Sequence, residues 1–518
     1  MAGSTAYLNG TVLTMVPGAP PARALAVQDG RIVAVGGEEA VRRFGGGEHR
    51  VVDLAGRAVL PGFVDPHNHF AVGALEAFWA DCRTPPLGTI AEVQAALRAA
   101  AAAAPAGEWV RGVGYHHAHL AERRHPTRAE LDEAVPERPA FLVHFSHHQG
   151  VANSRALATA GITRATCDPP GGEIGRDRDG EPTGLLFERA MASVERASRE
   201  GWEGRFVEVA SAASRRFAAL GLTTVQDAAV GPALERRYAA ADAAGRLAIR
   251  VARMVVAPSG WFDPPWAEAR TRGAGRTLKV FVDGGYRCAM RLPRDGREVA
   301  SGFLFYRQAE LAELLVTAWR NGWRVTCHAI GNLGVETCVG AVEDALARER
   351  RGAGRVRLDH AMFLTSALIS RIRALGLPVV TQPSFLYDQG PPAFTLPADL
   401  RCRPFGSLRA AGIPQAFSSD YPCGTAAPLV GVYAAVARRA RDGRPADPEE
   451  AVPVEAALAA YTREAARACG IEAECGTLEV GKRADLVILD RNPLEVPAEA
   501  VLGLRVTGTV VGGREVWP

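Results

Sequence analysis

The sequence predicts an α/β fold in which a (β/α)₈ barrel of the TIM type is joined to a small β-sandwich domain built from both termini. From about residue 61, apolar strand-like runs alternate with amphipathic or alanine-rich helical stretches. Such alternation is typical of parallel strands joined by helices. Both ends of the chain instead read as short β segments. We therefore expect residues 61–473 to form the barrel, and residues 1–60 together with 474–518 to form the sandwich.

The two β-rich ends share one pattern of short strands and tight turns. Residues 5–60 contain several strand-like runs, and Asp29–Gly30 stands between two of them as a hairpin turn. Residues 476–517 repeat the order of strand, turn and strand. Because chain termini often lie close together, one sheet domain can be assembled from both ends.

Seven apolar runs of the middle region read as barrel strands. In order along the chain they are VLPGFVDPHNH, GLTTVQDA, LKVFVDGG, WRVTCHAIG, RVRLDHAMF, LPVVTQPSF and IPQAFSSDYP. Residues 82–188 fit this rhythm less well, because they contain a histidine-rich loop over 114–125 and a stretch rich in glycine, proline and aspartate over 168–184. We expect a segment of about 82–188 to be inserted over the barrel mouth.

Composition excludes several classes of protein. The 518 residues carry a formal charge of only +3, without the basic blocks interleaved with aromatics that nucleic-acid binding favours. The sequence contains neither a run of eighteen apolar residues nor the pattern of a secretory signal. Nine scattered cysteines without a C-x-x-C pair indicate reduced thiols rather than a disulfide frame. We therefore expect a cytoplasmic protein that binds neither nucleic acid nor a membrane.

His67 and His69 give the sharpest local signal. They stand two residues apart at the end of an apolar strand, so their side chains share one face of that strand. Two imidazoles on one face can bind a metal ion. A hydrogen-bonded pair of structural histidines is the alternative for this motif on its own.

Residues of metal-ligand or base type recur at four later strand ends. Lys279, His328, His360 and Asp420 each lie within or just past an apolar run, with room for a helix between them. In a (β/α)₈ barrel the carboxyl ends of the strands converge on one rim. The sequence therefore predicts that these side chains meet His67 in one site.

In this order the motifs resemble the amidohydrolase superfamily, and within it the family-3 branch that includes N-substituted formamide deformylases. PGFVDPHNH, KVFVDG, CHAIGN, LDHA and SSDYP follow in family order, and GTLEVGKRADLVILDRNPLE is similar to the C-terminal segment of the family. GLTTVQDA, PTGLLFE and SHHQGVANSRAL resemble motifs of the branch. The resemblance covers nearly the whole chain.

The resemblance implies a role for each of these residues. His67 and His69 would hold a first metal ion, and Lys279, His328 and His360 match the bridging lysine and the histidines of a second. Lys279 would act as a carboxylated lysine, since a protonated ammonium is no ligand; a lysine paired with Asp283 or with a substrate carboxylate is the alternative. The final two residues of the site are Asp420, as general acid/base and further metal ligand, and His148, which would bind or polarise the substrate carbonyl.

The expected cofactor is Zn²⁺, one or two ions, with another divalent metal as the alternative. Bound metal lowers the pKa of water toward neutrality, and Asp420 would pass the proton to the leaving amine. The expected function is hydrolysis of a non-peptide C–N bond in a small linear amide, such as an N-formyl or N-acyl amine. Cyclic amide hydrolysis, deamination on the same site, and a metal-free binding or scaffold protein are the alternatives. A homodimer is one option for the oligomeric state.

Other polar residues near these motifs receive weaker assignments. Asp227, Asp283 and Asp359 also stand at strand ends, where they would orient metal ligands or cap helices. Asn332 stands where the branch usually carries an aspartate, so an amide is expected near the metal in place of a carboxylate. The remaining histidines of the insertion are expected to be solvated or locally hydrogen-bonded: His116, His117, His119, His125, His144 and His147.

Overall fold

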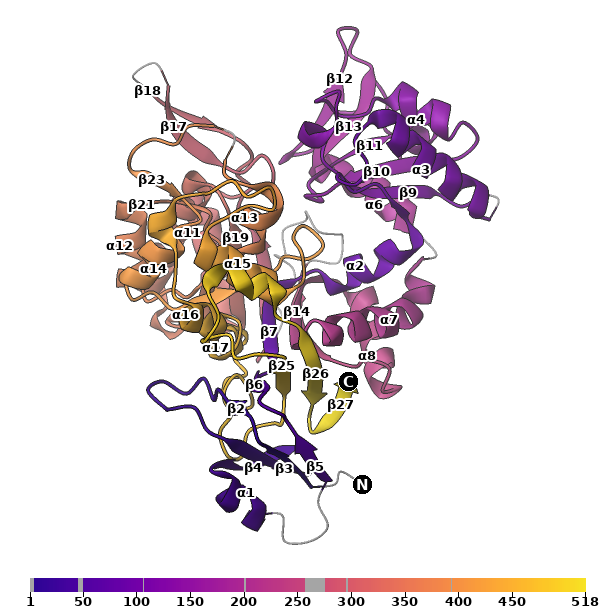
Figure 1. Cartoon of the computed structure of the whole chain (residues 1–518). Helices are drawn as coiled ribbons and strands as arrows, with labels where there is room; N and C mark the ends of the chain where they lie inside the picture. The colour runs from indigo at the N-terminus through magenta and orange to yellow at the C-terminus, as the bar shows by residue number, and fades with distance from the viewer. Residues whose placement is uncertain are drawn as a thin grey trace.

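An eight-stranded parallel sheet forms the centre of the molecule (Figure 1). The computed structural model describes residues 4–44, 50–105, 107–199, 202–256, 275–294, 297–392 and 394–518. Within them the strand order of this sheet is β24-β22-β20-β19-β16-β15-β14-β7, and every pair of neighbours is parallel. The predicted barrel is confirmed. Its strands are β7 (Phe63–Asn68), β14 (Leu222–Val230), β15 (Arg250–Val255), β16 (Thr277–Phe281), β19 (Arg324–Ala329), β20 (Val356–His360), β22 (Val379–Thr381) and β24 (Gln415–Phe417).

The first and last strands of this order meet at their carboxyl ends. Asp420, just past β24, donates its backbone N–H to the carbonyl of His67 on β7 at 2.9 Å. His69 donates its backbone N–H to the carbonyl of Tyr421 at 2.7 Å. These bonds nearly close the barrel at the end where the expected site residues lie.

β15 is the barrel strand that the apolar runs do not indicate. Its sequence RVARMV contains two arginines, and both pair with acids outside the strand. Arg250 lies 2.5 Å from a carboxylate oxygen of Asp485, and Arg253 pairs with Asp242. The two charges interrupt the hydrophobic run by which the other strands are recognised.

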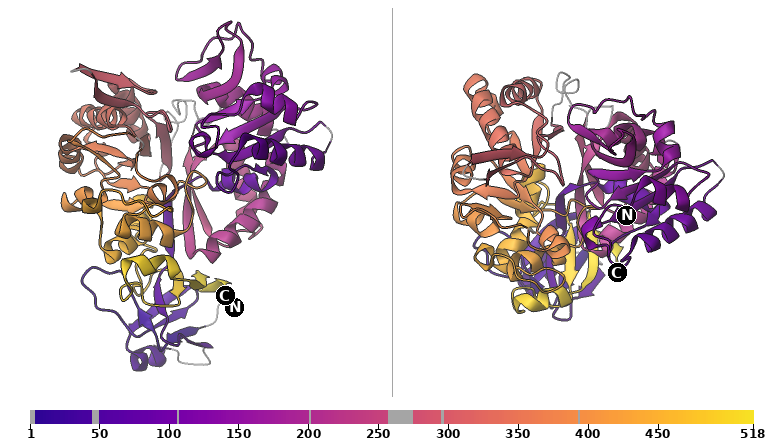
Figure 2. Two further views of the ribbon diagram at one scale, coloured as in Figure 1. Left: turned by 45° about the horizontal axis from the view of Figure 1, so that its top comes forward. Right: turned by 90° about the horizontal axis from the view of Figure 1, so that it is seen from above.

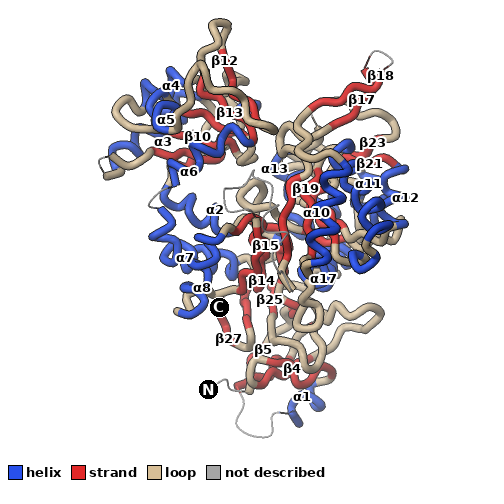
Figure 3. Tube along the Cα trace, turned by 180° about the vertical axis from the view of Figure 1, so that it is seen from behind, coloured by secondary structure: helices blue, strands red, loops and turns tan. Residues whose placement is uncertain are grey.

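Helices cover the outside of the barrel, with α7 and α8 on one side and α10 to α12 on the other (Figure 3). In α10 the side chains of Leu311, Leu315 and Trp319 are buried against the barrel, which is the periodicity expected of an amphipathic helix. No helix in the described ranges is long and apolar enough to cross a membrane. The barrel-layer helices are α7 (Phe206–Ala219), α8 (Pro232–Ala243), α10 (Gln308–Arg320), α11 (Asn332–Arg348), α12 (Ser366–Ala374), α13 (Ser384–Gln389), α14 (Phe405–Ala410), α15 (Pro428–Ala437), α16 (Val454–Ala460) and α17 (Arg463–Cys469).

Two small sheets lie below the barrel, and strands from both ends of the chain meet there (Figure 2). One has the order β4-β3-β1-β5 and the other β2-β6-β25-β26-β27, so the second combines strands from both ends of the chain. Leu25 and Ile32 of the first sheet share a buried cluster with Val59, Leu486 and Val510 of the second, as in a β-sandwich. The strands are β1 (Thr5–Leu8), β2 (Thr11–Val12), β3 (Ala24–Gln28), β4 (Arg31–Gly36), β5 (Arg50–Asp53), β6 (Ala58–Pro61), β25 (Leu486–Leu489), β26 (Val506–Val511) and β27 (Arg514–Trp517), with helix α1 (Glu38–Phe44).

The region expected as an insertion has its own six-stranded sheet, at the end of the barrel opposite the small sheets (Figure 1). The sheet order is β12-β13-β11-β10-β9-β8, and helices pack on it around a separate buried cluster that includes Leu97, Leu131 and Leu142. The elements are β8 (Ala80–Asp81), α3 (Ile90–Ala103), β9 (Val110–Tyr115), α4 (Arg128–Ala134), β10 (Ala140–His144), β11 (Gln149–Ala152), α5 (Ser154–Thr159), β12 (Gly172–Arg176), β13 (Pro182–Glu188) and α6 (Ala192–Arg199). We call this region the inserted unit. The exact domain limits stay a prediction.

Candidate metal centre

The carboxyl ends of five barrel strands bring the six expected metal-site residues together. His67 Nε2 and His69 Nε2 each lie 3.2 Å from Asp420 Oδ1, and Lys279 Nζ lies 3.3 Å from His67 Nε2. The ring of His360 is 4.8 Å from that of His67 and 4.3 Å from that of His328, measured between centroids. All six side chains are buried. The six residues therefore form one continuous cluster.

His67, His69 and Asp420 form the tightest part of this cluster. One donor atom from each of the three lies within 4.8 Å of the others. Burial and the charge of Lys279 oppose protonation of His67, but Asp359 and Asp420 outweigh them and raise its pKa. Burial alone would raise the pKa of Asp420, yet His67 and His69 hold it well below its usual range. The carboxylates thus draw positive charge into the site, as a cation site requires.

Asp359 fixes the orientation of His67. Its Oδ2 lies 2.6 Å from His67 Nδ1, and its Oδ1 accepts a hydrogen bond from Arg357 Nε at 2.9 Å. Arg357 also donates to Gln226 and to the carbonyl of Pro66, so the carboxylate is held from behind. A carboxylate on the outer nitrogen of a histidine is the usual support of a metal-binding imidazole, because it leaves the other nitrogen directed at the ion.

Lys279 is fully buried beside these groups. Its Nζ is 3.6 Å from Asp359 Oδ2, and burial lowers its pKa to about 8. The alternative, in which Lys279 pairs with Asp283, does not occur in the structure. Asp283 instead accepts backbone N–H groups from Ile330 and Gly331, both at 2.9 Å, so it orders the loop after β19.

His328 and His360 present nitrogens that suit a metal ion. His360 Nδ1 lies 2.9 Å from Gln382 Oε1, which leaves Nε2 as the inward atom. In the described part of the chain, neither His360 Nε2 nor His328 Nε2 has a hydrogen-bond partner, and His328 Nε2 is 3.6 Å from Asp283 Oδ1. Burial lowers the pKa of His360 to about 3 and that of His328 well below its usual value. Buried, neutral imidazoles with one ring nitrogen that makes no hydrogen bond in the described chain fit the ligand set of a metal.

His148 brings the inserted unit to the mouth of the barrel. Its Nδ1 lies 2.7 Å from Glu188 Oε2, and its ring centroid is 5.6 Å from that of His328. Gly285 donates its backbone N–H to Glu188 Oε1 at 3.0 Å. Burial opposes the charged form of His148, but Glu188 outweighs burial and raises the pKa of the imidazole. A histidine held in this way can donate a hydrogen bond to a substrate oxygen.

Several residues of this region have backbone angles that L-residues rarely adopt. The φ angles are 76° at His360, 53° at Asp420, 49° at Glu188 and 58° at His147. Such positions cost on the order of 1–3 kcal/mol each and cluster at functional sites. The strain at His360 and Asp420 coincides with the strand ends that direct their side chains into the cluster.

Three supporting residues had no assignment from the sequence. Gln382 follows β22 directly, Arg357 lies in the middle of β20, and Glu188 ends the motif PTGLLFE. The position of Gln382 directly after an apolar strand could have indicated a residue of the site. The partners of Arg357 and Glu188 lie far away in the chain, so only the fold reveals them. Asp227, by contrast, accepts from the backbone of Ala71 at 3.0 Å and from Tyr238, which places it behind the site.

Asn332 does not point to the cluster of metal-site residues. It begins α11, and its Oδ1 accepts the backbone N–H of Arg291 while its Nδ2 donates to the carbonyl of Arg291, both at 2.8 Å. Arg291 belongs to a hairpin of β17 (Met290–Arg294) and β18 (Arg297–Ser301). An amide satisfies both partners of this residue, whereas a carboxylate can only accept.

Three sequence matches extend over nearly the whole chain. The sequence model described as "Amidohydrolase family" matches residues 50–517. An N-substituted formamide deformylase of Arthrobacter pascens is 35% identical, over 98% of this chain and 97% of its own. The putative amidohydrolase YtcJ of Bacillus subtilis is 28% identical over 98% of each chain.

Solved structures agree on the fold. The crystal structure of an uncharacterized metal-dependent hydrolase from Pyrococcus horikoshii superposes with a TM-score of 0.75 at 23% identity, covering 96% of this chain and 99% of that one. The family match and the formamide deformylase relative, each spanning most of the sequence, show the class of reaction. The chain belongs to the amidohydrolase family and is a metal-dependent hydrolase of carbon–nitrogen bonds other than peptide bonds.

Proposed function

We propose that the enzyme hydrolyses small linear amides, with N-formyl amines as the preferred class. The observation that carries the proposal is the cluster of six buried side chains at the barrel mouth, in which Nε2 of His328 and Nε2 of His360 have no hydrogen-bond partner among the described residues. The choice of a linear amide rests on the 35% identity to an N-substituted formamide deformylase.

The ligand roles follow from the donor atoms. His67 and His69 would hold one ion together with Asp420, and His328 and His360 would hold a second. Lys279, carboxylated on Nζ, would join them, since its amine lies 3.3 Å from His67 Nε2 and is fully buried. We propose zinc, because imidazole and carboxylate donors in a site with an open position suit it. When bound, the metal lowers the pKa of water toward neutrality and polarises a carbonyl oxygen.

The protein supplies the proton transfers and the orientation of the substrate. Asp420 accepts a proton from the attacking water and delivers it to the leaving nitrogen, so that the C–N bond breaks to give an amine and a carboxylic acid. His148, held by Glu188 at 2.7 Å, donates a hydrogen bond to the amide oxygen as negative charge develops there. The inserted unit thereby contributes a residue that touches the substrate.

The experiment compares the formyl and acetyl amides of one amine with a cyclic amide of similar size, whose hydrolysis opens the ring. The free amino groups formed are measured with the purified enzyme, after chelation, and after addition of zinc, alongside elemental analysis. We expect the formyl compound to be cleaved fastest, and cleavage to stop on chelation and return with zinc. Cleavage of the cyclic amide alone would overturn the linear-amide proposal. A chain that binds no metal on reconstitution would overturn the ligand roles.

A further inference from the structure

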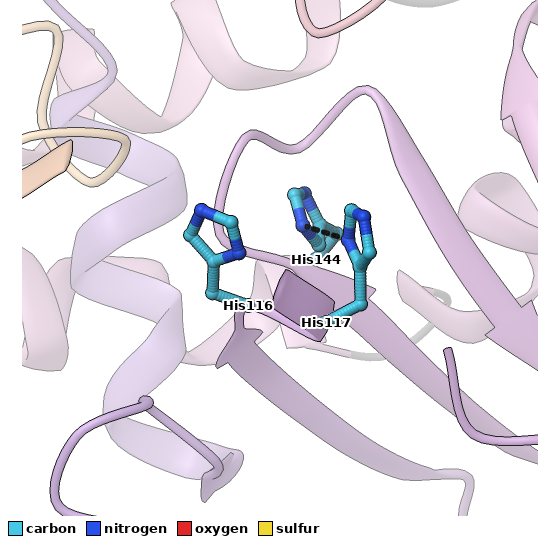
Figure 4. A group of neighbouring side chains, drawn as sticks. All are labelled: His116, His117 and His144. Carbon is cyan, nitrogen blue, oxygen red and sulfur yellow. Dashed lines mark hydrogen bonds between the residues drawn. The ribbon is translucent and has the colours of Figure 1, made fainter. Parts of the chain in front are cut away.

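A second group of histidines lies in the inserted unit, apart from the barrel cluster. One ring nitrogen each of His116, His117 and His144 lies within 4.8 Å of the others. The three side chains face one another from the loop after β9 and from the end of β10 (Figure 4). His144 is buried, which the sequence did not indicate, while His116 and His117 are half-buried. The group is thus enclosed on one side and accessible on the other.

The spacing of two nitrogens matches a shared metal ion. His117 Nδ1 and His144 Nε2 are 3.2 Å apart. Two imidazole nitrogens on one tetrahedral zinc, each about 2.0–2.1 Å from the ion, are separated by roughly 3.3 Å. The same spacing suits a hydrogen bond between the two rings, so the distance alone does not decide between these states. His116 adds a third imidazole, and a set of three ring nitrogens gathered in one place suits a metal ion better than a single hydrogen bond does (Figure 4).

The three imidazoles are electrically suited to a metal. Burial lowers the pKa of His116 to about 3, and burial also lowers the pKa values of His117 and His144. All three are therefore neutral at pH 7, and each has one ring nitrogen with a lone pair. His116 Nδ1 accepts the backbone N–H of Ala118 at 3.2 Å. Only imidazoles make up the group, and neutral nitrogen donors favour zinc, nickel or copper over magnesium or calcium.

Neighbouring side chains hold the rings in place. His144 Nδ1 lies 2.9 Å from Ser146 Oγ and 3.1 Å from the side-chain amide of Gln149. The backbone N–H of Ser146 donates to Nδ1 at 3.3 Å in the structure. When Nδ1 carries the proton instead, Ser146 Oγ or the amide oxygen of Gln149 accepts from it. That leaves Nε2 as the ligand atom. His125 stacks on His117 with centroids 4.0 Å apart, and Tyr286, from the barrel, packs edge-on 5.2 Å from His144.

We propose that His116, His117 and His144 form a metal site of their own, separate from the barrel centre, which takes one transition-metal ion of the zinc class. Three protein ligands leave a fourth position for water. The ion ties the loop after β9 to the end of β10. Because the turn that follows β10 leads to His148, the site stabilises the part of the inserted unit that reaches the barrel mouth.

The test counts metal ions in tag-free protein. Wild type, His117→Gln and a matched control, His119→Gln, are saturated with Zn²⁺ or Co²⁺, dialysed and analysed for metal. His119 is the control because it is exposed and stacks on His116 without belonging to the group. His116→Gln is a second variant at a half-buried position, in case His117→Gln fails to fold.

We expect wild type and His119→Gln to bind about one more ion per chain than His117→Gln and His116→Gln, whatever number the barrel holds. The visible Co²⁺ spectrum should lose the same component in both ligand variants, since a three-histidine site is tetrahedral. Equal metal counts and equal spectra in all folded proteins would overturn the proposal and leave a hydrogen-bonded histidine cluster.

Discussion

The close approach of Gly285 to His148 allows a sharp test of the part that the inserted unit plays in the reaction. A Cβ added at Gly285 would lie 2.1 Å from His148 Cδ2 and 2.4 Å from His148 Nε2. An ordinary contact begins at 3.4 Å, so in Gly285→Ala the imidazole must retreat by about 1.3 Å. The ring cannot yield easily, because it is buried and held by Glu188 at 2.7 Å. A displacement of about 1 Å at a positioned group can cost 100-fold in rate.

We therefore expect Gly285→Ala to lower kcat about 100-fold and to lower the free energy of unfolding by about 1–3 kcal/mol. The matched control is Gly231→Ala, on the loop after β14, where an added Cβ meets no atom within 4 Å. Amide hydrolysis and denaturant unfolding are measured for both variants, for His148→Ala and for the double variant. If the glycine acts through His148, the double variant is no slower than His148→Ala. Losses that multiply, or a folded Gly285→Ala with normal kcat, would refute the reasoning.

Three further predictions concern separate parts of the molecule. Asp420→Asn should lower kcat about 100- to 10,000-fold while the protein stays folded, since it removes the proposed proton carrier; a variant near full activity would exclude that role. Glu195→Gln removes the carboxylate charge that lies 3.1 Å from the fully buried guanidinium of Arg111 and should lower the free energy of unfolding at pH 7 by about 3–5 kcal/mol. Burial raises the pKa of Glu195, but Arg111 outweighs burial and holds it at about 2. The difference in free energy of unfolding between wild type and Glu195→Gln is therefore complete above pH 4.5, the ordinary pKa, and shrinks as the pH falls toward 2. A difference that is independent of pH in urea titrations would contradict the pairing. Asn332→Asp removes the donor to the carbonyl of Arg291 and should cost about 1–2 kcal/mol in the same titrations, with little change in metal content; loss of metal would show that Asn332 acts on the site after all.

The barrel could be predicted because its strands are buried on both faces. Seven of them read as continuous apolar runs, and the eighth, β15, is hidden by Arg250 and Arg253, whose partners Asp485 and Asp242 lie outside the strand. The sheet of the inserted unit was harder to see. Its strand β13 alternates buried and half-buried residues, and β8 has only two residues. Neither pattern is strong enough to identify a strand from the sequence alone.

The candidate metal site could be predicted for a different reason. Its ligand types stand at the ends of recognisable strands, and barrel geometry alone brings those ends together. The supporting contacts do not follow from such a rule. Glu188 reaches His148 across 40 positions of sequence, and Arg357 reaches the carbonyl of Pro66 across 291. These pairs depend on how the inserted unit and the strands pack, which no local pattern encodes.

In the structure, the expected site residues come from two separate parts of the molecule. The barrel alone supplies His67, His69 and Asp420, which are held by backbone bonds between β7 and β24. His148 comes from the inserted unit and reaches the barrel through Glu188 and the backbone N–H of Gly285. If His148 contacts the substrate as proposed, changes in the inserted unit alter that contact without disturbing the proposed metal ligands. On this reasoning, the choice among amides depends on the inserted unit, whereas the hydrolytic chemistry depends on the barrel.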